Sequence, residues 1–251
     1  MRATYRLILL LLSAGNASSA DLSWKSPDRR TAVVELYTSE GCSSCPPADR
    51  WFSGLKGQAG LFHDFIPLAF HVDYWDSIGW PDRFAAAAFS VRQSRYAAAR
   101  GLSQVYTPGV VLQGREWRGW TRAAGVPQPE QAMTGALELV LDPTGQAQLR
   151  WQPITASTAA FTGNISLLGM GLASSVMRGE NAGRQLQHDF VVLGMVSGKL
   201  VRQRNQLQLT LPLPHATNTA PRYAIAAWVS FGADPAPSQA VGGWLPVGWH
   251  P

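Results

Sequence analysis

The chain has few cysteines: Cys42 and Cys45 are the only two among its 251 residues. Without a second cysteine pair, a four-cysteine structural zinc site is excluded. The five methionines are scattered and form no Met-rich tract of the kind that would favour a copper protein. The basic residues form no Lys-rich cluster, so we predict no nucleic-acid partner.

Beyond the N-terminus the chain also lacks the roughly 20-residue apolar run that a transmembrane helix needs. Residues 1–20 have the pattern of a secretory signal peptide, with basic Arg2 and Arg6, an apolar stretch from Leu7 to Leu12, and small residues at Ser18–Ala20. We therefore predict a cleaved signal peptide and a periplasmic or secreted protein with no integral membrane segment after cleavage.

The two cysteines form a Cys-x-x-Cys motif between a predicted strand and a predicted helix. Thr31–Tyr37 is rich in β-branched and apolar residues, which favours a buried strand. Pro46 and Pro47 are tolerated in the first turn of a helix, where the backbone N–H groups have no helical partner. The helix dipole and these free N–H groups favour a thiolate. We predict Cys42 as the nucleophile and Cys45 as the resolving thiol.

A redox-active dithiol is the leading interpretation of this motif, and two alternatives stay open. A purely structural bridge across two intervening residues closes a small loop and removes little chain entropy. A metal site would use both thiolates, with His71 as a third ligand.

A second motif lies in Val105–Gly114, where Pro108 directly precedes an apolar run typical of a strand. A cis peptide bond is found essentially only before proline. In thioredoxin-like folds the proline at this place follows a cis bond and faces the Cys-x-x-Cys motif, which leaves room for an extended substrate. We therefore predict a cis bond between Thr107 and Pro108, and we expect both residues to bind substrate.

Four segments together resemble the exported, thioredoxin-like "domain of unknown function 1223" family of Gram-negative bacteria. The segments are Val34–Asp49, His71–Asp76, Tyr106–Pro108 and Gly179–Arg184. The resemblance spans nearly the whole mature chain and implies a thioredoxin-like fold, a signal peptide and a β-rich C-terminal part. The family has no settled activity. Gly109 departs from the pattern, since a larger polar residue is expected after the proline.

Other residues are candidates for the same site. Glu35 resembles the buried acid that assists proton transfer in thioredoxins, although a one-residue offset would turn it to the other face of the sheet. His71 and Asp73 alternate along the second predicted strand, Phe65–Asp73, so we expect them to approach one pocket. The Ser43 and Ser44 hydroxyls can hydrogen-bond a thiolate, whereas a structural role is expected for His188.

The fold class expected is an α/β thioredoxin-like domain at 22–142, followed by a β-rich, sandwich-like domain at 145–251. A helical insertion is expected at about 74–104, including an Ala-rich helix at 83–100, and a closing helix at 130–141. The predicted strands of the second domain are Ala147–Trp151, Phe161–Leu168, Phe190–Met195, Gln206–Leu213 and Tyr223–Phe231.

The function expected is thiol:disulfide exchange on protein disulfides through Cys42 and Cys45, without a cofactor. The partners would be a cysteine-containing protein substrate and a redox partner protein. A copper-binding protein or metallochaperone using the same cysteines is one alternative, and a non-catalytic interaction protein on the same scaffold is another.

Overall fold

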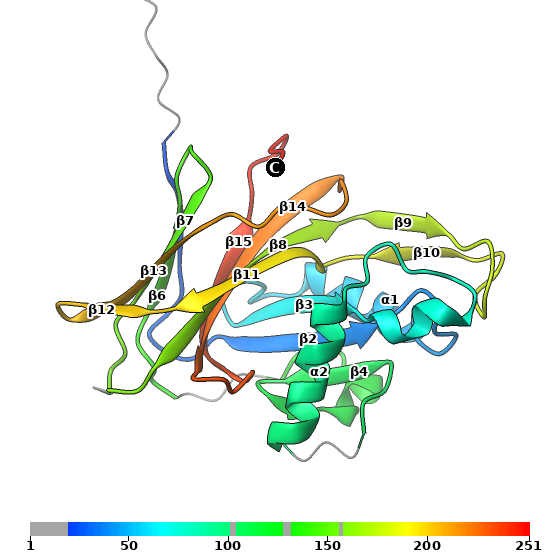
Figure 1. Cartoon of the computed structure of the whole chain (residues 1–251), viewed down its shortest axis with the longest axis horizontal. Helices are drawn as coiled ribbons and strands as arrows, with labels where there is room; N and C mark the ends of the chain where they lie inside the picture. The colour runs from blue at the N-terminus through cyan, green and yellow to red at the C-terminus, as the bar shows by residue number, and fades with distance from the viewer. Residues whose placement is uncertain (1–19, 101–103, 128–131, 156–157) are drawn as a thin grey trace, which may run out of the picture.

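The computed structural model describes residues 20–100, 104–127, 132–155 and 158–251, and it consists mostly of β-sheet (Figure 1). The strands are β1 Leu22–Lys25, β2 Ala32–Thr38, β3 Phe65–His71, β4 Gly109–Leu112, β5 Arg115–Glu116, β6 Leu137–Leu141, β7 Gln146–Trp151, β8 Phe161–Met170, β9 Leu172–Ser175, β10 Gln185–His188, β11 Val191–Lys199, β12 Val201–Gln203, β13 Gln206–Pro212, β14 Arg222–Phe231 and β15 Pro237–Trp244. The helices are α1 Pro46–Gly54 and α2 Ala87–Arg100, with short 3₁₀ helices η1 Leu55–Gly57, η2 Asp73–Ile78 and η3 Arg118–Arg122.

In the described residues the strands form three sheets. The largest is eight-stranded, in the order β15-β14-β8-β11-β3-β2-β4-β5, the second is five-stranded, in the order β1-β6-β7-β13-β12, and β10 pairs with β9. No helix in the part of the chain that the structure describes is long and apolar enough to cross a bilayer. The predicted signal peptide, up to residue 19, lies outside the described residues.

Strands β2 and β3 form a parallel pair within the eight-stranded sheet, with Thr38 opposite His71. Every residue of both strands is buried, as expected for parallel strands that are covered on both faces. On one face lies α1, whose Asp49 accepts a hydrogen bond from the Thr38 hydroxyl at 2.9 Å. On the other face lies α2, where the rings of Phe70 and Phe89 meet with centroids 5.2 Å apart.

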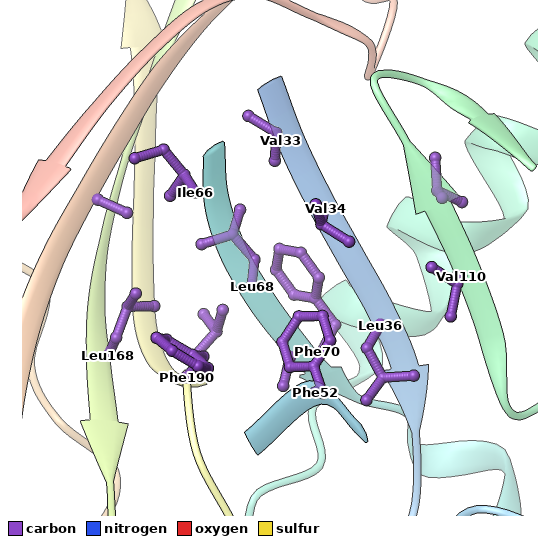
Figure 2. Packing of buried hydrophobic residues seen from close by; sticks show 14 of the residues in the cluster. Val33, Val34, Leu36, Phe52, Ile66, Leu68, Phe70, Val110, Leu168 and Phe190 are labelled. Carbon is purple, nitrogen blue, oxygen red and sulfur yellow. The ribbon is translucent and has the colours of Figure 1, made fainter. Parts of the chain in front are cut away.

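An apolar core holds α1 against the sheet. Figure 2 shows Leu36 of β2, Phe52 of α1 and Phe190, just before β11, among its members. The rings of Phe52 and Phe190 meet edge to face, with centroids 5.9 Å apart. Because full burial of such a side chain contributes about 1.5–3 kcal/mol, this packing fixes the helix that follows the two cysteines.

The two predicted domains contribute strands to the same sheets. β3 pairs in parallel with β11, and the Ala69 N–H donates a hydrogen bond to the Phe190 carbonyl at 2.8 Å. Conversely, β1 and β6 join β7, β13 and β12 in the five-stranded sheet. Strands from before and after the predicted boundary at 142–145 therefore pair within the same two sheets, each half contributing one contiguous block of strands.

The strands predicted in the second half of the chain are confirmed as β7, β8, β11, β13 and β14, and the predicted Ala-rich helix is confirmed as α2, beginning at Ala87. The predicted closing helix at 130–141 is wrong where the structure describes it: Leu137–Leu141 is β6, and residues 130–131 lie outside the described part. In β6 the residues Leu137, Leu139 and Leu141 are buried and Glu138 and Val140 are partly exposed. This two-residue alternation is the pattern of a half-buried strand.

Glu35 lies on the α2 face of β2, within a buried polar cluster. Arg92 of α2 donates two hydrogen bonds to its carboxylate, one to each oxygen, both at 2.8 Å. The hydroxyls of Tyr37 and Tyr96 donate to the same two oxygens. The Glu35 carboxylate is therefore fully engaged in tying α2 to the sheet, and its charge is balanced by the guanidinium.

Removing one partner of this buried pair leaves an uncompensated charge, so we predict that Arg92→Met lowers the free energy of unfolding by about 3–5 kcal/mol. Arg95→Met on the same helix is the matched control, because Arg95 is exposed and its loss should change stability by no more than about 0.5 kcal/mol. Denaturant unfolding followed by circular dichroism measures both. Equal losses for the two variants would contradict this role for Arg92.

Candidate functional site

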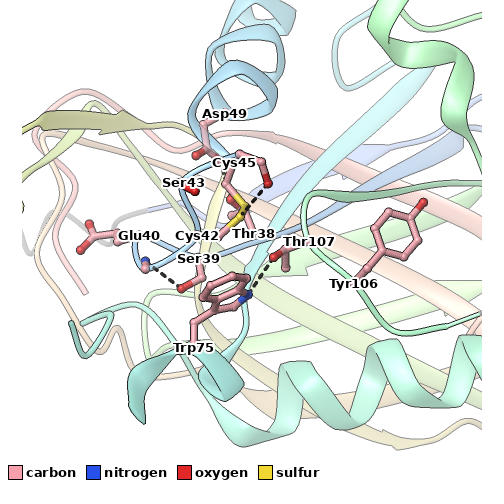
Figure 3. Close-up of a disulfide and its surroundings, with 12 residues drawn as sticks. Thr38, Ser39, Glu40, Cys42, Ser43, Cys45, Asp49, Trp75, Tyr106 and Thr107 are labelled. Atoms are coloured by element: carbon pink, nitrogen blue, oxygen red, sulfur yellow. Dashed lines mark hydrogen bonds between the residues drawn. A yellow bond between two sulfur atoms is a disulfide. The ribbon is translucent and has the colours of Figure 1, made fainter. Parts of the chain in front are cut away.

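Cys42 and Cys45 form a disulfide at the start of α1, with their Cα atoms 5.4 Å apart (Figure 3). Cys45 is the N-cap residue and Pro46 and Pro47 form the first turn, as predicted. Both cysteine residues are fully buried, at 0% exposure, so exposure does not single out Cys42 as the nucleophile. A partner can reach the sulfur atoms only after the surrounding segments move.

Two of these segments are η2 and the loop before β4. The Cβ atom of Trp75, in η2, would lie 3.2 Å from a Cβ atom at Gly41, directly before Cys42. The Trp75 indole N–H donates a hydrogen bond to the Thr107 hydroxyl at 2.8 Å. The Thr107–Pro108 peptide bond is cis, as predicted. Figure 3 shows Thr107 and Trp75 in the surroundings of the disulfide, so Thr107, one of the two predicted substrate-binding residues, lies near the cysteines.

Gly109 departs from the family pattern for a steric reason. A Cβ atom there would lie 2.9 Å from the Tyr106 carbonyl oxygen and 3.1 Å from Gln93 Nε2. Gln93 Nε2 donates a hydrogen bond to that same carbonyl at 2.7 Å. Glycine thus lets α2 bind the loop that carries the cis proline.

A third segment, residues 176–184 between β9 and β10, lies against the motif from the C-terminal half of the chain; we call it the strap. Asn181 of the strap is fully buried, and its Nδ2 donates to the Glu40 and Cys42 carbonyls, each at 2.9 Å. The Ser43 N–H donates to Glu180 Oε2 at 3.0 Å. The strap therefore binds the backbone on both sides of Cys42.

Five buried ionisable side chains gather on the same side of the sheet as α1: Glu40, Asp49, His71, Asp82 and His188. His71 Nδ1 lies 2.6 Å from Asp82 Oδ2, and the His71 and His188 rings meet edge to face with centroids 4.9 Å apart. His188 Nε2 lies 3.4 Å from Glu40 Oε1, and His188 Nδ1 lies 3.9 Å from Asp49 Oδ2. Glu40 and Asp49 also lie in the surroundings of the disulfide (Figure 3).

The pKa shifts in this cluster run in opposite directions. Burial raises the pKa of Asp49, and the nearby His188 and His71 only partly oppose the shift. Burial also acts on Glu40, but there the neighbouring His188, together with donors such as the Trp80 indole, outweighs it and lowers the pKa. For His71 the carboxylate of Asp82 outweighs burial and raises the pKa. Asp49 is thus the carboxyl group whose shift favours holding a proton.

The other predicted site residues are separated. Glu35 faces α2, opposite to the face on which α1 lies, because it is three residues before Thr38 in a regular strand. The structure does not bring His71 and Asp73 together, because β3 ends at His71 and Asp73 begins η2, where it pairs with Ser90 of α2. The expected alternation along one strand therefore does not extend to Asp73.

Of the two serines between the cysteines, the Ser44 hydroxyl lies 3.4 Å from Cys42 Sγ, within reach of a weak hydrogen bond, and the Ser43 N–H reaches the strap.

Sequence reasoning missed Asp49, Glu180 and Asn181. The four-residue spacing from Cys45 to Asp49 on one helix was a usable signal. Among the described residues, no group of three or more His, Cys, Asp or Glu side chains is arranged to hold a metal ion.

If the strap covers the disulfide, weakening it should expose the thiols. We predict that Asn181→Ala, which removes two hydrogen bonds worth roughly 0.5–1.5 kcal/mol each, accelerates alkylation of the reduced protein about tenfold. Asn218→Ala is the control, because Asn218 likewise donates to a backbone carbonyl, that of Arg83, on a different loop. Alkylation rates are measured by mass spectrometry. If both variants react at the rate of the wild type, the strap does not cover the cysteines.

Comparison with known proteins shows two structures of similar fold and one matching family. Protein AGR_C_4864 from Agrobacterium tumefaciens has a similar fold, at 23% identity and a TM-score of 0.55, over 85% of this chain and 93% of that one. HBP35 of Porphyromonas gingivalis is similar at 10% identity and a TM-score of 0.59, over 86% of this chain and 76% of that one. No curated protein matches. Residues 33–230 match the family described as "Protein of unknown function (DUF1223)", and the chain belongs to that family.

Proposed function

We propose that this protein is a periplasmic or secreted thiol:disulfide oxidoreductase with a thioredoxin-like N-terminal region. The observation that carries the proposal is a Cys-x-x-Cys disulfide that lies between β2 and α1, with Cys45 as the N-cap of α1, and that has Thr107 of the cis Thr107–Pro108 bond in its surroundings. The parallel β2 and β3 strands, α1, and the antiparallel β4 strand that follows the cis proline support the thioredoxin-like assignment.

In the proposed reaction the reduced Cys42 thiolate attacks one sulfur of a substrate disulfide, and the other substrate sulfur leaves as a thiolate. Cys45, as a thiolate, then attacks Cys42 Sγ, the mixed disulfide breaks, and the second substrate thiolate leaves. Two electrons have passed from the enzyme dithiol to the substrate, and each released thiolate takes up a proton. Oxidation of a substrate dithiol is the same sequence in reverse, and a redox partner protein restores the starting form.

Asp49, and not Glu35, is suited to exchange a proton with Cys45. It lies four residues after Cys45, a spacing that puts Cβ atoms on a helix roughly 5–6 Å apart. Its Oδ1 accepts from the Thr38 hydroxyl, whereas no described hydrogen bond reaches its Oδ2. Because burial raises the pKa of Asp49, the group can hold a proton that the Cys45 thiol has released.

Since both cysteine residues are buried, substrate access depends on the strap, η2 or the loop before Pro108 moving aside. Such a cover limits reaction of the dithiol to partners that can displace it. Mobile covers over reactive groups commonly control both access and rate.

The proposal predicts that Cys45→Ser, expressed as the exported full chain, accumulates mixed disulfides through Cys42, because the resolving thiol is missing. Cells are quenched with acid, free thiols are blocked, and adducts are detected on non-reducing gels and identified after reduction.

Cys42→Ser in the same background is the matched control and should form few adducts. The absence of adducts with Cys45→Ser, although the variant is folded and exported, would contradict a thiol:disulfide oxidoreductase. Equal adduct levels with both variants would contradict Cys42 as the nucleophile.

A further inference from the structure

The strap carries an acidic residue that the proposed dithiol chemistry does not use. Glu180 is exposed, and its Oε2 accepts a hydrogen bond from the Ser43 N–H at 3.0 Å. None of the cations that the structure describes forms an ion pair with this carboxylate. Its described partner is thus the residue that directly follows Cys42.

The Ser43 N–H lies where a hydrogen-bond donor can stabilise a cysteine thiolate. Backbone N–H groups ahead of a helix stabilise negative charge, and at a reactive cysteine they stabilise the thiolate. In the disulfide form Cys42 is uncharged, so no thiolate competes with the Glu180 carboxylate for the hydrogen bond from the Ser43 N–H. In the reduced form a Cys42 thiolate would compete for the same donor and would face a negative charge at close range.

We infer that Glu180 is a positioning residue that favours the Cys42–Cys45 disulfide over the reduced Cys42 thiolate, and that the strap therefore binds the oxidised protein more tightly than the reduced protein. The inference rests on the proposed oxidoreductase function and adds a regulation of the same site. Because linkage is reciprocal, a contact that stabilises the disulfide must also be weakened by reduction.

The remaining strap contacts explain why one carboxylate can have this effect. Asn181 holds the backbone at Cys42, and its Oδ1 in turn accepts from Arg184 Nη1 at 3.0 Å. Gly79 and Gly179 both have positive φ, and a Cβ atom at Gly79 would lie 3.5 Å from Gly179 Cα, so η2 and the strap meet closely. The Glu180 charge is therefore held at the motif by neighbours that carry no charge change during the redox cycle.

Other ionisable groups belong to the buried cluster near the disulfide: Glu40 before Cys42, Asp49 of α1, His71 of β3, Asp82 before α2, and His188 of β10. These groups are buried and are unchanged by a substitution at the exposed Glu180, so a comparison of the variants measures the effect of the Glu180 charge alone. Hydrogen bonding by the Ser43 side chain and by the Ser43 N–H lowers the pKa of Glu180, so the Glu180 carboxylate is charged at neutral pH.

The test compares the wild type with Glu180→Gln and Glu180→Lys. Each protein is equilibrated with glutathione, which supplies two electrons and becomes glutathione disulfide as the Cys42–Cys45 bond breaks. The thiolate pKa of Cys42 is measured from ultraviolet absorbance against pH. Glu138→Gln, a partly exposed glutamate of the five-stranded sheet, is the control for the loss of one negative charge.

We expect Glu180→Gln to shift the equilibrium about two- to fivefold toward the dithiol, the size typical of a surface charge near a helix N-terminus. For a two-electron couple this corresponds to roughly 10–20 mV. The Cys42 thiolate pKa should fall in parallel, Glu180→Lys should shift both quantities further, and Glu138→Gln should shift neither. Hydrogen exchange of residues 176–184 should be faster in the reduced wild type than in the oxidised form.

The outcomes separate this inference from the proposed function. A disulfide that glutathione reduces reversibly, but with the same equilibrium and the same thiolate pKa in all variants, would overturn the role of Glu180 and leave the oxidoreductase standing. A disulfide that resists glutathione in every variant would contradict the oxidoreductase itself. Hydrogen exchange of the strap at the same rate in the reduced and the oxidised protein would overturn the coupling between the strap and the dithiol.

Discussion

The parallel pairing of β2 with β3 is the constraint on which the rest of the site depends. It places Thr38 opposite His71, so the ends of both strands and the segments that follow them meet at one edge of the sheet. The chain turns there into the Cys-x-x-Cys motif and α1 after β2, and into η2 after β3. The hydrophobic effect acting on Leu36, Phe52 and their neighbours fixes α1, and with it the geometry of the disulfide.

The cluster of buried polar side chains near the disulfide also follows from the pairing of β2 with β3. His71 and Thr38 point to the α1 face, where Asp49 and His188 complete a cluster that an isolated strand and helix could not build. Buried charged groups are costly unless they are paired, and strongly perturbed ionisable groups cluster at functional sites, so their presence beside the Cys42–Cys45 disulfide supports the proposed function. The C-terminal half contributes His188 and the strap to the cluster and its cover, which gives that half a direct part in the proposed chemistry.

Some of this could be predicted from the sequence, because the signals were local. The Cys-x-x-Cys motif before two prolines fixed the start of α1, and Pro108 before an apolar run gave the cis bond. The helix expected at 130–141 rests on the helical spacing of Met133, Ala136, Leu137 and Val140, whereas the alternation of Leu137, Leu139 and Leu141 decides for a strand. Glu35 was placed near the cysteines by analogy, although the strand alternation that turns it toward Arg92 was readable. Glu180, Asn181 and His188 could not be placed, because they meet the motif from more than 130 residues away.

The most direct test of the central claim is the reduction potential of the mature wild-type chain in glutathione buffers, with Cys42 and Cys45 followed by thiol alkylation. A catalytic dithiol at this position should show a reversible two-electron transition between roughly −120 and −270 mV, and the value would set the direction of electron flow. A disulfide that stays oxidised below about −300 mV would contradict the account and mark the Cys42–Cys45 bond as structural.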